Sequence, residues 1–308
     1  MKSLNSLVRF TPPGLALALG VTFLAATALA HPYATCLTND SGVISFRLNE
    51  AADTVKVLWN GGSSSITLGA LDRGLTVTNL TAQGITSPFQ VEVTKAGSGV
   101  PTLISDNNNV LNQFYGPRAV AVNKRPASPY FGRIYVGNAP GTTASGRPTG
   151  DGIYVLNADS TDAVGQGNTA LTAGIDMATG GASMPWRMRV GQDDDQLYIC
   201  DWSDPAGNLW VADPNVSAGS GVAIFMAPIG TMASPLDASM NHGSISEVYV
   251  TGSRATSDLT VYTVDEDYET NPGFKTELNS LWRYDIGAGS LPWSTLPNAK
   301  LATPPVAF

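Results

Sequence analysis

The chain of 308 residues has little of what most enzyme active sites are built from. It holds two histidines, His31 and His242, so a site of several imidazoles is excluded, as is a Ser-His-Asp hydrolase unless His242 serves alone. It also lacks a G-x-S-x-G nucleophile motif, a phosphate-binding loop and a dinucleotide fingerprint after a strand. These absences favour a non-enzymatic protein and leave an enzyme as the alternative.

Cysteine and positive charge are also scarce. Cys36 and Cys200 are the only cysteines; export would permit a disulfide between them, but their distance along the chain does not suggest a local disulfide. Cys200 lies in a strand-like segment, where it reads as a small buried apolar residue. With 17 basic against 25 acidic residues the net charge is −8. No basic patch is visible, so we expect neither nucleic acid nor an anionic membrane surface as a partner.

Long hydrophobic runs are confined to the N-terminus. Lys2 and Arg9 accompany an apolar stretch that ends in the cleavage pattern Ala28-Leu29-Ala30, so residues 1–30 read as a signal peptide. Its removal takes the net charge from −8 to −10. The stretch is too short for a comfortable membrane span, and the mature chain has no other candidate. We therefore expect an exported protein that is periplasmic, extracellular or at the cell surface.

Cleavage after Ala30 would make His31 the first residue of the mature chain. Its amine and imidazole could then chelate copper, but the second histidine that such a site needs would have to be the distant His242. A cleavage boundary that happens to precede a histidine is the simpler interpretation.

The first part of the mature chain alternates apolar and polar residues, as half-buried strands do. The segments with this pattern are 43–48, 54–59, 65–68, 75–79 and 89–94. They predict a small Ig-like β-sandwich over residues 31–100. Residues 44–57 resemble the Ig-like modules related to the flagellar hook-capping protein. That resemblance implies a spacer or docking unit and carries over no catalytic residue.

A unit of three short strands occurs three times in the rest of the chain. The middle strands align on Tyr135, Tyr198 and Tyr262, with spacings of 63 and 64 residues. Such even repetition is typical of β-propeller blades, which bury their faces only against their neighbours. We predict an all-β chain with three consecutive four-stranded antiparallel sheets. Their equivalent innermost strands would be residues 118–123, 186–191 and 247–252.

The first repeat also matches a known motif. Its matching residues are Phe114, Pro117, Arg118, Val120, Ala121, Val122, Asn123, Gly132, Ile134, Tyr135 and Val136. They resemble the opening of an NHL-repeat propeller blade, with Ala119 where glycine is usual; the second repeat keeps only Pro185. Propellers have about 4–8 blades. We therefore expect residues 101–308 to form a partial NHL-like propeller, truncated at the C-terminus or completed by something else.

Two clusters are candidate binding sites. Arginines in the first strands of the repeats would face the propeller channel and attract an anion, and neighbouring indole rings could line a groove for a sugar or a peptide. This gives Arg118, Arg187, Arg189, Trp186 and Trp202 as binding residues, although most aromatic residues should pack between blades. The run Asp193-Asp-Asp195 could supply carboxylates to Ca²⁺. Asp193, Asp194 and Asp195 are also typical turn residues, which is the more ordinary interpretation.

The sequence thus favours a secreted, non-enzymatic protein that binds a protein or carbohydrate ligand on a propeller surface. Two alternatives stay open. The resembling propellers include lyases and Ca²⁺-dependent lactonases with a metal on the axis, and such a site could lie partly in missing blades. Among the first strands only Glu247 is acidic, which argues against that alternative. The second alternative is a structural spacer at the cell surface.

Overall fold

The computed structural model describes residues 32–85, 88–96, 110–144, 146–178, 184–202, 208–225, 245–265, 280–292 and 299–300. The predicted signal peptide, His31, His242 and Trp293 lie outside these ranges. Within them, no helix is long and apolar enough to cross a membrane.

The described chain is built of strands and three single turns of 3₁₀ helix, which confirms the all-β prediction. The strands are β1 (Ala34–Asp40), β2 (Val43–Leu48), β3 (Ala52–Trp59), β4 (Ser64–Leu71), β5 (Gly74–Asn79), β6 (Gln90–Thr94), β7 (Pro117–Val122), β8 (Ile134–Asn138), β9 (Thr143–Ala144), β10 (Arg147–Pro148), β11 (Gly152–Leu156), β12 (Arg187–Val190), β13 (Leu197–Cys200), β14 (Leu209–Ala212), β15 (Val222–Ala223), β16 (Ile245–Thr251), β17 (Thr260–Asp265), β18 (Ser280–Asp285) and β19 (Ala299–Lys300). The 3₁₀ turns are η1 (Asn60–Gly62), η2 (Thr81–Gln83) and η3 (Val110–Asn112).

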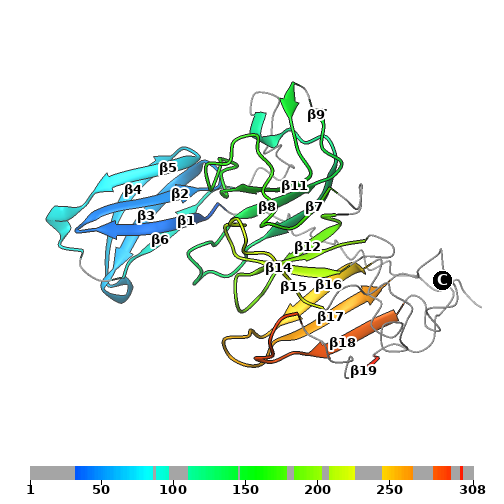
Figure 1. The fold of residues 1–308 in the computed structure, drawn as a ribbon. Helices are drawn as coiled ribbons and strands as arrows, with labels where there is room; N and C mark the ends of the chain where they lie inside the picture. The colour runs from blue at the N-terminus through cyan, green and yellow to red at the C-terminus, as the bar shows by residue number, and fades with distance from the viewer. Residues whose placement is uncertain are drawn as a thin grey trace, which may run out of the picture.

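Strands β1 to β6 form two three-stranded antiparallel sheets, with the orders β1-β2-β5 and β4-β3-β6. Alternate residues of β2 and β3 are buried, as the sequence pattern predicts for strands with one face toward a core. Ile44, Phe46, Val55 and Val57 are fully buried in the shared core. The two sheets therefore form a small sandwich (Figure 1).

The remaining large sheets follow one another along the chain. Their strand orders are β11-β8-β7, β12-β13-β14-β15 and β16-β17-β18-β19. The first strand of each repeat lies at an edge of its own sheet, and β12 contacts β7 on one side and β16 on the other. The predicted innermost strands are thus adjacent and equivalent (Figure 1). Neighbouring blades of a propeller have this relation, and the described sheets form an open stack.

The first sheet departs from the predicted four strands. The segment after β11 pairs with it at the isolated bridges Ile153–Leu171 and Leu156–Asp162 and does not form a regular strand. Asp162 accepts hydrogen bonds from the backbone N–H groups of Val164, Gly165 and Gly167, at 3.0, 2.8 and 2.7 Å. These bonds curl the segment into a turn, so it cannot extend as a regular fourth strand.

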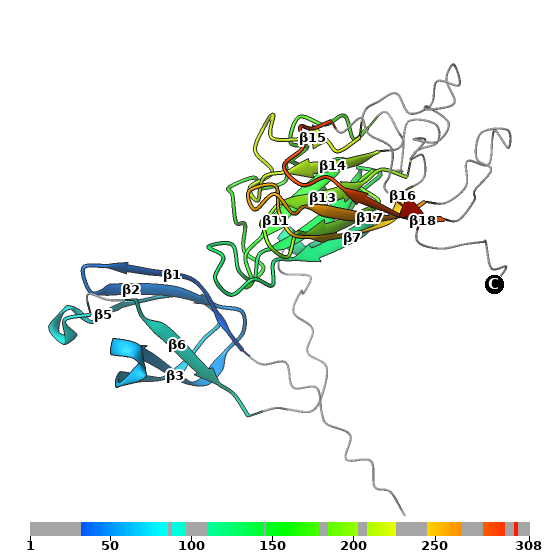
Figure 2. The same cartoon turned by 90° about the horizontal axis from the view of Figure 1, so that it is seen from below.

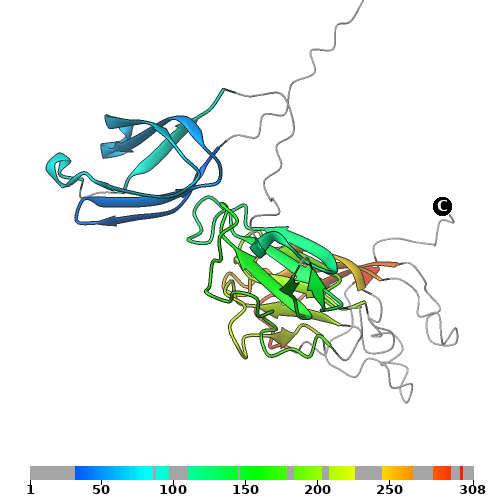
Figure 3. The same cartoon turned by 90° about the horizontal axis from the view of Figure 1, so that it is seen from above.

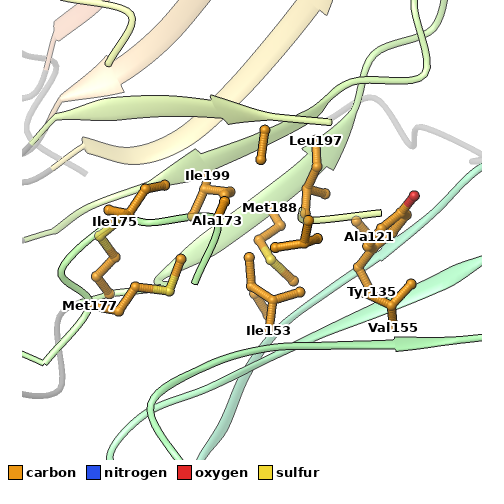
Figure 4. Close-up of a cluster of buried hydrophobic side chains, with 14 of the residues drawn as sticks. Ala121, Tyr135, Ile153, Val155, Ala173, Ile175, Met177, Met188, Leu197 and Ile199 are labelled. Atoms are coloured by element: carbon orange, nitrogen blue, oxygen red, sulfur yellow. The ribbon is translucent and has the colours of Figure 1, made fainter. Parts of the chain in front are cut away.

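Apolar side chains fill the space between successive sheets. Figure 4 shows the first such core, in which Met188 of the second sheet lies beside Ile153 of the first, and Ile199 lies beside Ala173. A second core lies between the second and third sheets and includes Tyr198. Each repeat thus packs its faces against its neighbours.

The three aligned tyrosines have different surroundings. Tyr135 and Tyr198 are buried in the first and second cores, whereas Tyr262 is half-buried beside Tyr249, with 6.3 Å between ring centroids. Tyr249 is 44% exposed. Tyr262 therefore lies at the position of the third sheet that corresponds to Tyr135 and Tyr198, each of which packs against the next sheet. In contrast, Tyr284 of β18 and Ile286 are buried in the second core.

The sandwich lies to one side of the stacked sheets (Figures 2 and 3). The Nη1 atom of Arg47 in β2 lies 2.8 Å from the Oδ2 atom of Asp159, whose side chain is 1% exposed. Arg73 donates to the backbone carbonyl of Asp159, and Tyr33 packs on Phe131 with ring centroids 5.3 Å apart. Polar and aromatic contacts therefore join the sandwich to the first sheet.

Candidate ligand-binding site

Four of the five predicted binding residues lie together at one end of the first and second sheets. Arg118 belongs to β7 and Arg187 begins β12, while Trp186 comes directly before β12 and Trp202 follows β13. The antiparallel pairing of β12 with β13 puts Arg187 opposite Cys200, and the Trp186 N–H donates to the Cys200 carbonyl at 3.0 Å. The strand register therefore brings the two indoles together.

Glycine in the neighbouring strand allows this end of β12 to approach β7. A Cβ atom at Gly137 in β8 would lie 2.8 Å from the Cγ atom of Pro185 and 3.3 Å from the Cβ atom of Ala119. The first of these distances is shorter than real Cβ contacts. Because Pro185 precedes Trp186, the absent side chain helps to place the indole beside Arg118.

The two tryptophans form a parallel stack. Their ring centroids are 4.5 Å apart, and the interplanar angle is 19°. The guanidinium carbons of Arg118 and Arg187 lie 5.1 and 5.3 Å from the centre of the Trp186 ring. Both distances are within the range of a cation–π interaction, so Trp186 is the centre of the cluster.

Backbone carbonyls hold the two guanidinium groups in place. The Nε atom of Arg118 donates to the Ala139 carbonyl at 2.8 Å. The Nη1 atom of Arg187 donates to the carbonyls of Arg118 and Trp186 at 2.9 and 3.1 Å. Within the described ranges neither guanidinium forms an ion pair. Both charges are therefore positioned but not neutralised by a carboxylate.

Next to the tryptophan stack is a hollow of about 600 Å³. We call it the Arg–Trp hollow, and its lining residues are Tyr115, Gly116, Pro117, Arg118, Ala139, Pro140, Trp186 and Arg187. None of them is acidic, and none is a large aliphatic residue. The hollow therefore offers aromatic rings and positive charge. Such a surface can bind a flat or ring-shaped polar molecule without reacting with it.

Tyr115 was not among the predicted site residues. Its side chain is 55% exposed and lines the Arg–Trp hollow. It lies in the segment Phe114-Tyr115-Gly116-Pro117, in which the sequence analysis used only the residues of the repeat motif. The sequence signal that could have identified Tyr115 is its place directly before a glycine and a predicted strand that carries an arginine.

Arg189 does not belong to this cluster. Its Nη2 atom lies 3.2 Å from the Oε1 atom of Glu247, and its Nε atom donates to the Val248 carbonyl. It lies two residues further along β12 than Arg187, and its contacts are with β16 of the third sheet and not with the Arg–Trp hollow. Its charge is used in contacts between sheets.

The three consecutive aspartates point to different partners. Asp193 accepts from the Gly252 N–H at 2.8 Å, Asp194 accepts from the Tyr198 hydroxyl at 2.8 Å, and Asp195 pairs with Arg125 at 2.8 Å. Burial raises the pKa of the Asp194 carboxyl above its usual range, although the hydrogen bond from Tyr198 acts in the opposite direction. In the part of the chain that the structure describes, no three carboxylate, imidazole or thiol groups are arranged to hold a metal ion.

A second cavity, of about 450 Å³, lies between the second and third sheets. Asp193, Asp194, Arg125 and Arg254 line it together with apolar residues such as Leu259. Because both signs of charge are present, this cavity indicates no preference for an anion or a cation. The Arg–Trp hollow is the more specific of the two.

The cysteines are both free thiols, Cys36 exposed and Cys200 buried. The burial of Cys200 confirms its interpretation as a small core residue of a strand. The binding cluster is therefore not cross-linked to the sandwich.

Comparison with known proteins adds no family to these observations: no family model matches the chain, and a search of curated proteins gives no match.

Proposed function

We propose that this protein is an exported, non-enzymatic binding protein whose Arg–Trp hollow holds a carbohydrate ligand. The observation that carries the proposal is the stack of Trp186 and Trp202 with the guanidinium groups of Arg118 and Arg187 beside it. Aromatic rings bind sugars with little loss of conformational entropy, and guanidinium N–H groups donate to sugar oxygens. Neither role requires a nucleophile or a general base.

The size of the site favours a small ligand over a large protein surface. Protein partners typically bury about 800 Å² on each side, around a core of well-packed side chains. The Arg–Trp hollow is a shallow, open depression, and its volume of about 600 Å³ falls in the range of small-molecule sites.

The experiment is binding of the mature full-length chain to an array of immobilised oligosaccharides. We expect binding to a defined subset of sugars, and we expect replacement of Trp186 by alanine to weaken it. The Tyr249→Ala variant is a matched control, because it removes an exposed aromatic residue from the third sheet.

Because Trp186→Ala also removes a half-buried ring, Tyr115→Ala provides a second test. Tyr115 is 55% exposed, so its loss should leave the fold unchanged while it weakens binding. Binding to no saccharide, or equal effects of Tyr115→Ala and Tyr249→Ala, would overturn the proposal. Capture of a specific protein partner instead would favour the alternative of a protein-binding surface.

A further inference from the structure

Within the described ranges Arg118 and Arg187 form no ion pair, and these two positive charges stand close together in a protein whose net charge is −8. Among the other described arginines, Arg47, Arg125, Arg189 and Arg283 form ion pairs with carboxylates, whereas Arg133 and Arg147 donate to carbonyl oxygens. In the Arg–Trp hollow, by contrast, no lining residue is acidic. The hollow is therefore a local site of positive potential on a chain with acidic character overall.

The contacts of Arg118 and Arg187 also fix how these charges are presented. Each guanidinium lies against the Trp186 ring and donates to at least one backbone carbonyl. An arginine held in this way loses less rotamer freedom when it binds a ligand, and its other N–H groups suit a carboxylate or sulfate. The site is thus preorganised for an anionic group.

The same contacts limit what a neutral sugar could gain. Trp202 and two guanidinium groups already cover much of the half-buried Trp186 ring. Tyr115 is the lining aromatic residue with a largely exposed side chain. A neutral sugar could stack on Tyr115 but would leave the two charges without a counter-ion.

We infer that the ligand of the Arg–Trp hollow is an acidic saccharide, whose carboxylate or sulfate groups bind Arg118 and Arg187 while a sugar ring packs on Tyr115. This inference rests on the proposed function. It adds the chemical class of the ligand, which the array experiment alone does not require.

The test is calorimetric titration of the mature full-length chain with matched pairs of oligosaccharides. One pair is a hexamer of galacturonic acid and its carboxyl-reduced form; the other is a sulfated hexamer and its desulfated form. We expect at least one acidic hexamer to bind about tenfold more tightly than its neutral partner, which corresponds to about 1.4 kcal/mol. Its affinity should fall as salt is added, because the charges are partly exposed.

Variants assign the preference to the hollow. Arg187→Gln and Arg118→Gln should each reduce the preference for the acidic hexamer to about threefold or less, since each removes one charge-assisted contact. Arg254→Gln is the matched control, because it removes the same charge from an exposed residue that lines the second cavity. Arg187 is itself exposed, so its variant should fold even if the Arg118 variant does not.

The outcomes separate this inference from the proposed function. Equal binding of acidic and neutral hexamers, or binding of none of the four, would overturn the inference and leave carbohydrate binding intact, whereas binding to no saccharide of the array would overturn both. Two further results would contradict the inference: an equal effect of Arg254→Gln and Arg187→Gln, or tighter binding of an acidic peptide such as hexaglutamate than of any saccharide.

Discussion

Replacement of Gly137 by alanine tests how the tryptophan stack is built. The new Cβ atom would lie 2.8 Å from the Cγ atom of Pro185, and 3.3 Å from both the Cβ atom of Ala119 and the Cε atom of Met188. Overpacking of this kind costs about 1–3 kcal/mol. Loss of glycine freedom in the unfolded chain offsets this by about 0.4–1 kcal/mol. We therefore expect a net loss of stability of about 1–2 kcal/mol.

The variant should also disturb the binding cluster, because Pro185 directly precedes Trp186. Denaturant unfolding measures the loss of stability, and circular dichroism measures the exciton coupling that a stacked indole pair produces. Gly150→Ala is the control, since its Cβ atom would meet nothing closer than the Cβ atom of Ala170, at 3.3 Å. A Gly137→Ala protein with wild-type stability and unchanged exciton coupling would refute the role of this close approach.

Two further predictions concern groups that hold the first sheet together. Arg147 is 2% exposed and donates to the carbonyls of Leu111, Gln113 and Gly167. Arg147→Met should therefore lower the free energy of unfolding by about 3–5 kcal/mol, as measured by denaturant unfolding. A loss below about 1 kcal/mol would contradict this role. Backbone hydrogen bonds hold the pKa of Asp162 below its usual range in spite of partial burial. The Asp162 carboxylate therefore stabilises the fold above the pKa of the unfolded chain, and this contribution is lost as the pH falls through the folded pKa. Asp162→Asn should be less stable than wild type at neutral pH and equally stable below both pKa values, as unfolding curves across that range would show; a constant difference would contradict the assignment.

Much of the architecture follows from the sequence because it depends on local patterns. Alternation of apolar and polar residues locates β2 and β3, and the spacing of Tyr135, Tyr198 and Tyr262 finds the repeated sheets. Strand β1 was missed. It carries a bulge between Thr35 and Thr38, and its residues after Thr35 are exposed, so it shows no alternation of buried and exposed positions.

The candidate site was only partly predictable. Arg118, Arg187, Trp186 and Trp202 share strand ends of adjacent repeats, so their proximity follows once the repeats are aligned. The ion pair of Arg189 depends on which face of β12 meets the third sheet, and a sequence pattern of four residues does not determine that face.

The most direct test of the account is to record the indole N–H resonances of the mature chain by NMR during titration with an acidic hexasaccharide. The proposed site predicts that the Trp186 and Trp202 resonances shift together and saturate, while that of Trp59, in the sandwich core, stays unchanged. Assignment by single Trp→Phe variants identifies each resonance. Saturable binding that shifts other indoles but leaves Trp186 and Trp202 unmoved would contradict the Arg–Trp hollow as the ligand site.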